Sequence, residues 1–302
     1  MPNSSNVVFR TSLDDIPLSG TLSRPKGAFK GVILMIVGSG KVDRHESTSA
    51  DLTFSGKDEA LFDQLRDVAV AQGFATFQYD KRGVLDSHGN VNPETWVTAD
   101  RAHLVSDAVD AAETLLSETS AQILDLILLG HSEGTIIATE VAIKLGGTVR
   151  ALLLFGAQAR SMKDMLHYQM VESRSKQTSG TGSVGTPEEE FQKALDMIAS
   201  HTDPLAPDGK PIEWYRQHLA APSNADQMKL VDGKKFIFQG EIDPQTPLAE
   251  VDLFRIAGVE NLSVHTFQGI GHGFSPDKNG RPTLGPIDRA VLEKFAVILR
   301  EL

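Results

Sequence analysis

The sequence predicts an α/β fold in which a mainly parallel sheet is flanked by helices. Short apolar runs, each the length of a buried strand, alternate along the 302 residues with segments whose apolar side chains recur at helical spacing. Some runs are apolar throughout, which is typical of strands covered on both faces. One run, residues 126–129, leads directly into a glycine-flanked turn and a helical pattern. These observations favour one core that carries insertions over two separate domains.

The first half of the chain follows this alternation in order. Residues 7–11 and 16–23 are predicted to pair as an opening hairpin, with two aspartates at its turn. The apolar residues 31–37 predict a central strand, which ends where Gly38 begins a glycine-rich loop. The next expected elements are a helix over 58–72, a strand over 74–79, a helix over 99–117, the strand that ends at 129 with its helix to 145, and a strand over 151–155.

An insertion is predicted in the second half. Residues 157–233 separate two apolar strands, where a parallel connection commonly needs about a dozen residues. Within them, 162–170 and 188–199 are predicted to be helical, and the Gly- and Ser-rich residues 179–185 have the composition of a linker. We therefore expect a core domain made of 1–156 and 234–302, and a helical cap insertion over 157–233. The core continues with a strand over 236–238, a helix over 247–258, a strand over 262–267 and a closing helix over 286–302.

Composition excludes several classes of function. The formal net charge of -11 and the absence of a basic cluster argue against a nucleic-acid partner. No run approaches the roughly 20 apolar residues that span a bilayer, and residues 1–10 lack the apolar centre of a signal peptide, so a cytoplasmic protein is expected. Without cysteine the chain has no thiol nucleophile and no cysteine-ligated metal site. The chemistry expected below needs no metal or cofactor, so none is expected. The expected partner is a small-molecule substrate, and a homodimer is left open.

Residues 130–134 read G-H-S-E-G, the pattern that places a serine on a sharp turn between a strand and a helix. Ser132 is therefore the candidate nucleophile, with a simple helix cap as the alternative. A serine hydroxyl is a weak nucleophile unless a base takes its proton. Of the nine histidines, only His272 lies in a glycine-rich loop just after a predicted strand and late enough to follow an acid, so it is the candidate base. His131 is expected to support the site or to pack.

The acid that orients the base is expected directly after the strand that ends near residue 240. Asp243 occupies this place, whereas the strand over 151–155 has no carboxylate close behind it. Glu241 is the alternative, because a side chain two residues earlier on an extended backbone points the same way. The sequence thus predicts a triad of Ser132, Asp243 and His272.

With these residues in place, the chain resembles an α/β-hydrolase-fold serine esterase of the bacterial carboxylesterase type. The order nucleophile, acid, histidine matches that family, and the resemblance covers nearly the whole chain. Three further segments, 38–44, 80–83 and 240–247, are similar to family loops. The resemblance implies an oxyanion hole formed by the backbone N–H groups of Glu133 and Ser39, with Gly40 as the neighbour. Val37 departs from the family, in which histidine is common at that position.

The predicted function is a serine hydrolase that cleaves carboxylic esters through an acyl-enzyme intermediate. A thioesterase, an acyltransferase or an exopeptidase would use the same triad, and a weakly catalytic ligand-binding protein could retain it. Met165 and Tyr168 in the insertion are candidate substrate contacts, although such residues equally form the core of a small cap. Residues 43–46 either line the mouth of the site or form a solvated ion-pair loop. Residues 180–185 satisfy G-x-G-x-x-G, but no strand precedes them, so no dinucleotide site is expected.

Overall fold

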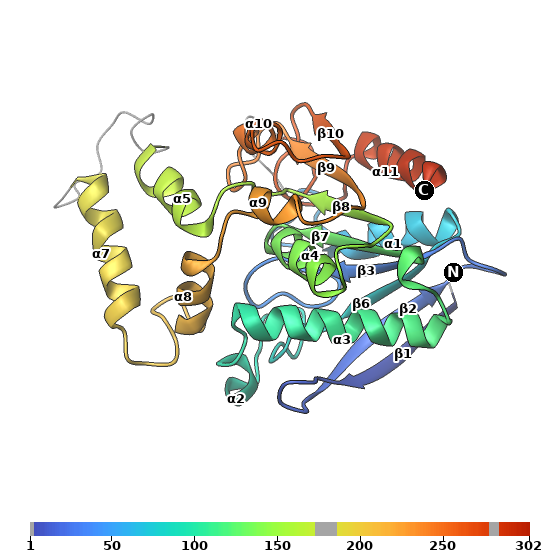
Figure 1. Cartoon of the computed structure of the whole chain (residues 1–302), viewed down its shortest axis with the longest axis horizontal. Coiled ribbons are helices and arrows are strands. Elements are labelled where there is room, and N and C mark those ends of the chain that lie inside the picture. The colour runs from blue at the N-terminus through green and yellow to red at the C-terminus, as the bar shows by residue number, and fades with distance from the viewer. Residues whose placement is uncertain (1–2, 173–185, 278–283) are drawn as a thin grey trace.

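The computed structural model describes residues 3–172, 186–277 and 284–302. Within these residues, eight strands form one sheet (Figure 1). The β1–β2 and β2–β6 pairs are antiparallel and the other pairs are parallel, so the predicted mainly parallel sheet is confirmed. In sheet order the strands are β1 (Asn3–Arg10), β2 (Pro17–Arg24), β6 (Ala75–Tyr79), β3 (Val32–Ile36), β7 (Leu126–His131), β8 (Ala151–Phe155), β9 (Lys234–Gly240) and β10 (Leu262–Phe267).

The central strands are buried on both faces because nearly all of their side chains are apolar. In β3, Leu34 joins the apolar cluster on one face of the sheet, while Ile33 and Met35 join the cluster on the other. This alternation follows the two-residue period of a strand. The strands β7 and β8 alternate in the same way, so three adjacent strands form a rigid centre from which the turns at their carboxyl ends project.

Helices cover both faces of the sheet. Apolar residues of α1 and α11 pack on the face that contains Ile33, and those of α3, α4 and α10 pack on the opposite face. The predicted closing helix begins only after Asp288, whose side chain accepts the N–H of Ala290 at 2.8 Å. The helical elements of the core are α1 (Leu61–Ala71), α2 (Pro93–Trp96), α3 (Arg101–Thr119), η1 (Ile123–Asp125), α4 (Glu133–Lys144), α10 (Ala249–Ile256) and α11 (Arg289–Glu301).

A small hairpin, β4 (Ser47–Thr48) with β5 (Glu59–Ala60), lies between β3 and α1 and has no counterpart among the elements predicted from sequence. Its strands are only two residues long, too short for a periodic pattern to reveal. The hairpin matters because its residues border the cavity described below. No helix among the described residues has both the length and the apolar character that crossing a membrane requires.

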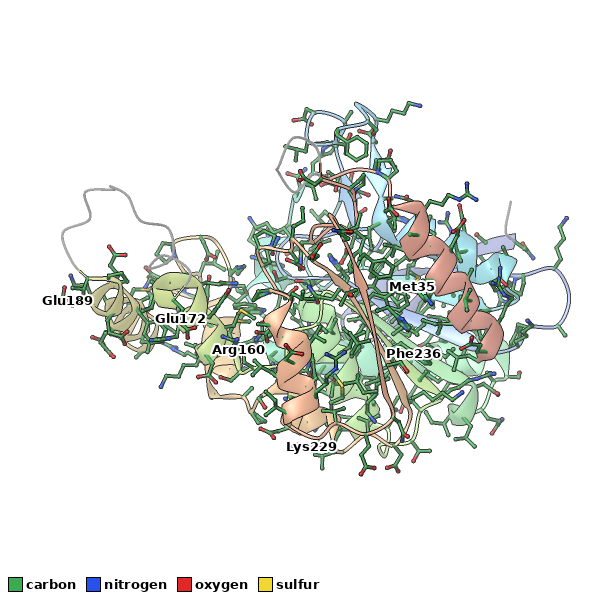
Figure 2. All side chains as sticks on the ribbon, turned by 90° about the horizontal axis from the view of Figure 1, so that it is seen from above. Met35, Arg160, Glu172, Glu189, Lys229 and Phe236 are labelled. Carbon is green, nitrogen blue, oxygen red and sulfur yellow. The ribbon has the colours of Figure 1, made fainter. Side chains whose placement is uncertain are left out.

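Helices also occupy the described chain between β8 and β9. They are α5 (Met162–His167), which continues as the π-helical turn η2 (Tyr168–Glu172), then α7 (Pro187–Ser200), α8 (Ile212–Ala220) and α9 (Asn224–Met228). Figure 1 shows α5, α7 and α8 at one end of the molecule, and Figure 2 shows Glu172 and Glu189 there, far from Met35 and Phe236 of the sheet.

These helices are not packed as a fully separate body. Ile198, Ala206 and Ile212 form a small apolar cluster of their own, whereas Trp214 of α8 and Met228 of α9 belong to the main core. The division into a core and a cap at residues 157 and 233 therefore stays a prediction. The predicted linker over 179–185, with the G-x-G-x-x-G pattern at 180–185, lies outside the described residues.

Candidate active site

Ser132 stands on a sharp turn between β7 and α4. Its backbone has φ 54° and ψ −121°, a conformation that residues with a side chain rarely adopt. Two glycines make the turn possible. A Cβ at Gly134 would lie 2.0 Å from the carbonyl oxygen of Ile36, and a Cβ at Gly130 would lie 2.2 Å from that of Gly134. Helix α4 therefore approaches β3 closely, and its N-terminus lies directly behind the serine.

Asp243 and His272 form a close pair in the loops after β9 and β10. Asp243 Oδ2 lies 2.7 Å from His272 Nδ1, and the Asp243 side chain is fully buried. The same carboxylate accepts the Thr246 hydroxyl at 2.6 Å and the N–H groups of Gln245 and Thr246 at 2.8 and 3.0 Å. Burial would raise the pKa of Asp243, but the hydrogen bond and charge of His272, together with the Thr246 bonds, hold it below its usual value.

This arrangement prepares His272 to act as a base. Because the ionised Asp243 only accepts hydrogen bonds, Nδ1 of His272 carries the proton and Nε2 is left to accept one. His272 and Ser132 line the same cavity, of about 240 Å³. No hydrogen bond joins the Ser132 hydroxyl to His272 within the described residues, and such bonds often tighten only when substrate is bound. The three predicted triad residues are thus brought to one edge of the sheet.

Glu241, the alternative acid, has a different environment. Its side chain is exposed, and its Oε2 accepts the N–H of Gly269 at 3.3 Å. The carboxylate that contacts His272 is that of Asp243. The extended backbone ends at Gly240, and the chain then turns, with the Asp243 N–H donating to the Gly240 carbonyl oxygen at 3.4 Å, so Glu241 and Asp243 do not lie on one extended strand.

The loop after β3 lies against the nucleophile. A Cβ at Gly38 would lie 3.2 Å from the Cβ of Ser132. The Gly38 N–H already donates to Glu46 Oε1 at 2.5 Å, and its carbonyl oxygen accepts Lys81 Nζ. Ser39 lines the cavity that contains Ser132, whereas Gly40, with φ 87°, faces open space. Of the two predicted loop donors, Ser39 therefore lies at the cavity, and the role of its N–H group stays a prediction.

Glu133 has a buried carboxylate that the sequence did not single out. Its Oε2 lies 3.1 Å from Lys81 Nζ, and its Oε1 contacts Trp214 Nε1 and, at 3.2 Å, His218 Nε2. Burial would raise the pKa of Glu133, but the Lys81 charge, followed by the interactions with His218 and Trp214, holds it far below its usual value. This cluster joins the nucleophile turn to the loop after β6 and to α8. Of the partners of Glu133 in this cluster, only Lys81 lies in a segment that the sequence marks by its similarity to a family loop, residues 80–83.

The charged segment 43–46 divides its residues between the two roles expected for it. Arg44 pairs with Asp80 in the loop after β6, and His45 Nδ1 contacts the carboxylate of Asp63 in α1, each at 2.7 Å. Glu46 instead lines the cavity and pairs with His131, Nδ1 to Oε2, at 2.6 Å. No group of three or more His, Asp or Glu side chains in the described part of the chain is arranged to hold a metal ion.

A second cavity, of about 220 Å³, reaches Ser132 from the side of α5 and α8. Met165, a predicted substrate contact, lines it and is 2% exposed. Tyr168, the other predicted contact, is not among the lining residues, and the guanidinium of Arg160 lies 4.8 Å from the centre of its ring. The lining consists of Ser39, Ser132, Glu133, Ile136, Gln158, Met162, Met165, Leu166, Gln169, Lys210, Trp214, Tyr215, Gln245 and Thr246.

Comparison with known families gives one match over most of the chain. A family model described as serine aminopeptidase, S33, matches residues 56–279. No curated protein matches the sequence significantly.

Solved structures share the fold over nearly the full length. Est1E from Butyrivibrio proteoclasticus is 15% identical, with a TM-score of 0.60 over 97% of this chain and 96% of that one. The dienelactone hydrolase from Anabaena variabilis ATCC 29413 is 15% identical, with a TM-score of 0.56 over 99% and 96% of the two chains. The esterase domain of a Rhodothermus marinus protein is 14% identical, with a TM-score of 0.56 over 99% and 95%. At these identities, the likeness establishes the fold.

Proposed function

The chain belongs to the serine aminopeptidase S33 family and has the α/β-hydrolase fold, and on this basis we propose that it is a serine hydrolase that cleaves carboxylic esters. One observation carries the proposal. The buried carboxylate of Asp243 bonds His272 Nδ1 at 2.7 Å, and His272 lines the same cavity as Ser132, which stands on its strained turn. This is the arrangement that nucleophilic catalysis by serine requires.

In the first half of the proposed reaction, His272 Nε2 takes the hydroxyl proton of Ser132 as Oγ attacks the ester carbonyl carbon. Asp243 stabilises the imidazolium that forms, and it remains ionised because its pKa is held low. The negative charge that develops on the carbonyl oxygen is met by the backbone N–H groups of Ser39 and Glu133. His272 then gives its proton to the departing alkoxide, the C–O bond breaks, and an acyl-enzyme on Ser132 remains.

In the second half, His272 takes a proton from water, and the hydroxide attacks the acyl carbon. The second tetrahedral intermediate uses the same two N–H groups. When it collapses, the Ser132 oxygen leaves and recovers its proton from His272, and the carboxylic acid is released. Each step moves one proton to or from His272 Nε2. The Asp243 carboxylate bonds the other ring nitrogen, Nδ1, so Nε2 is available to accept that proton in the resting enzyme.

Two cavities that meet at Ser132 support the binding of a substrate on both sides of the scissile bond. The cavity beside α5 and α8 has an apolar side made by Met162, Met165 and Leu166, and we assign the acyl group to it. The other cavity includes small and acidic residues such as Ser47 and Glu59 of the β4–β5 hairpin, and we assign the alcohol to it. Thioether side chains adapt to varied apolar shapes, which suits an acyl pocket.

A peptide substrate is the second candidate, and the description of the matching family favours it. An exopeptidase would use the same triad, so its residues do not separate the two reactions. Rates on matched p-nitrophenyl esters and aminoacyl p-nitroanilides do separate them. We expect turnover of the esters, and a higher kcat/KM on the anilides would replace the ester proposal.

The central test uses Ser132→Ala. This variant should lose turnover of p-nitrophenyl acetate and should no longer gain the mass of a fluorophosphonate adduct, while its circular dichroism spectrum stays that of the wild type. Substantial remaining turnover would contradict the assignment of the nucleophile. A wild-type protein that reacts with neither reagent would instead favour a ligand-binding role.

A further inference from the structure

A second buried acid–histidine pair lies beside the triad. Glu46 and His131 are each 8% exposed, and Glu46 Oε2 lies 2.6 Å from His131 Nδ1. The other ring nitrogen, His131 Nε2, lies 3.1 Å from the backbone carbonyl oxygen of His272. The other carboxylate oxygen, Glu46 Oε1, accepts the N–H of Gly38 at 2.5 Å. These contacts form one continuous chain of polar groups from the loop after β3 to the loop that carries His272.

The hydrogen positions in this chain follow from its acceptors. A carbonyl oxygen only accepts, so His131 Nε2 must carry a hydrogen to bond His272. His131 Nδ1 and Glu46 Oε2 are 2.6 Å apart, close enough for an ion pair, although the direction of the contact is not that of a well-formed hydrogen bond. Burial opposes both charges, but the charge of each partner outweighs it, lowering the pKa of Glu46 and raising the pKa of His131. The contact between the two groups therefore favours an imidazolium paired with a carboxylate.

Both members of the pair are themselves fixed. Glu46 has a left-handed backbone, with φ 50°, and its carbonyl oxygen accepts the N–H of Leu61 at the start of α1. His131 is the last residue of β7, next to the nucleophile. Its ring centre lies 4.8 Å from that of His272 and 6.1 Å from that of Phe274. The ring thus fills the space between the central strand and the loop that carries the candidate base.

We propose that Glu46 and His131 are positioning residues that hold the His272 loop and the Gly38 loop in register with Ser132. This role rests on the proposed function, because the pair affects the rate of ester hydrolysis only through the candidate base and the oxyanion donors. His131 holds the carbonyl oxygen of His272, which limits rotation of the loop and keeps the ring directed at the serine. Glu46 holds Gly38, which keeps the next N–H group, that of Ser39, at the cavity.

Three variants separate this role from simple stability. Glu46→Gln keeps the size of the side chain, and its amide can still accept from Gly38 and donate to His131 Nδ1. Glu46→Leu removes the hydrogen bond to Gly38 and the ion pair with His131. His131→Phe keeps a ring in the same space but removes the donor to His272. We expect Glu46→Leu and His131→Phe to lower kcat on p-nitrophenyl acetate by about 10- to 100-fold with KM within about twofold, because each leaves buried groups unpaired. Glu46→Gln should restore kcat to within about threefold.

The matched control is Glu250→Gln. Glu250 is also a fully buried glutamate whose carboxylate accepts backbone N–H groups, those of Ala159 at 2.8 Å and Arg160 at 3.2 Å, and pairs with the Arg160 guanidinium at 2.7 Å. In the part of the chain that the structure describes, its carboxylate bonds neither the His272 loop nor the Gly38 loop. It should lose thermal stability and keep its kcat. The proposal is overturned if Glu46→Leu and His131→Phe, folded at the assay temperature, keep kcat within about threefold, or if Glu250→Gln loses as much kcat as they do.

A second measurement does not depend on turnover. In protein labelled with ¹⁵N-histidine, the signals that disappear in His131→Phe identify His131. In the wild type, both ring nitrogens of His131 should stay protonated through the pH range in which exposed histidines lose a proton, and in Glu46→Gln this protonation should be lost. A singly protonated His131 at neutral pH in the wild type would overturn the ion pair. Failure of ester hydrolysis alone would refute only the proposed function.

Discussion

The buried carboxylate of Glu133 gives the sharpest prediction about stability. Its side chain is 2% exposed and lies within reach of Lys81, His218 and Trp214. Glu133→Gln keeps an oxygen that can accept from Trp214, but it removes the negative charge and turns an N–H₂ group toward other donors. Removing one partner of a buried ion pair commonly costs about 3–5 kcal/mol, because the remaining charge stays buried without compensation. We expect the lower end, about 3 kcal/mol, since one hydrogen bond survives.

The assay is equilibrium unfolding in urea, followed by tryptophan fluorescence and circular dichroism. Trp214 lies in the cluster, so its emission reports on the same region. In a chain of this size, about 3 kcal/mol corresponds to a fall in melting temperature of about 5 °C. The matched control is Glu293→Gln on α11, whose pair with Arg289 is closer, 2.6 Å against 3.1 Å for Glu133 and Lys81, but has side chains that are 61% and 90% exposed. Its unfolding midpoint should not move, because water screens exposed pairs.

The pH dependence of the stability difference between wild type and Glu133→Gln follows from the direction in which the pKa of Glu133 is shifted. The pKa of Glu133 is lower in the folded protein than in the unfolded chain, so its stabilisation is present above about pH 4 and is lost as the pH falls through the folded value. The difference in unfolding free energy between wild type and Glu133→Gln should be constant from pH 6 to 8, and it should shrink below about pH 4. A difference under about 1 kcal/mol at pH 7, or one that does not shrink in acid, would refute the reasoning.

Two further predictions concern the reaction. Asp243→Asn should lower kcat by about 10³- to 10⁴-fold, because the amide no longer fixes the tautomer of His272, whereas Glu241→Gln should be close to wild type; comparable losses in a p-nitrophenyl acetate assay would contradict the choice of acid. Met165→Ala enlarges the cavity beside α5, so kcat/KM should shift toward longer acyl chains relative to acetate. Met197→Ala, on the partly exposed side of α7, should leave the chain-length profile unchanged, and an unchanged profile for both would refute the assignment of the acyl group to that cavity.

The sheet could be predicted from sequence because buried strands require local patterns. Residues 31–37 and 126–129 are apolar throughout, and the corresponding β3 and β7 are covered on both faces. The meeting of Ser132, Asp243 and His272 follows from the same feature, since the turns after parallel strands all lie at one edge of the sheet. Their geometry agrees with the predicted triad, while their chemical roles stay predictions.

The partners of Glu133 and Glu46 could not be predicted from local patterns. Glu133 meets Lys81 because the loop after β6 lies beside the start of α4, and it meets Trp214 because α8 packs against the same turn; the three residues are far apart in the chain. Glu46 lies in a charged segment whose composition fits a solvated loop as well as a buried pair. Tyr168 is a different case: its residue type suits a pocket, and η2 places its ring beside the guanidinium of Arg160, outside the lining of the cavity next to α5. Its role as a substrate contact stays a prediction.

The strained backbone of Ser132 has a consequence for which residue is most stable at this position. Glycine adopts φ 54° and ψ −121° without strain, whereas a serine in this conformation lowers the folding stability by about 1–3 kcal/mol. Under selection for folding stability alone, substitution of Ser132 by glycine would therefore be favoured, since it relieves the strain. The hydroxyl at this position therefore carries a cost in folding stability that the fold itself does not require. The strained backbone of Ser132 supports its proposed role as the nucleophile for that reason.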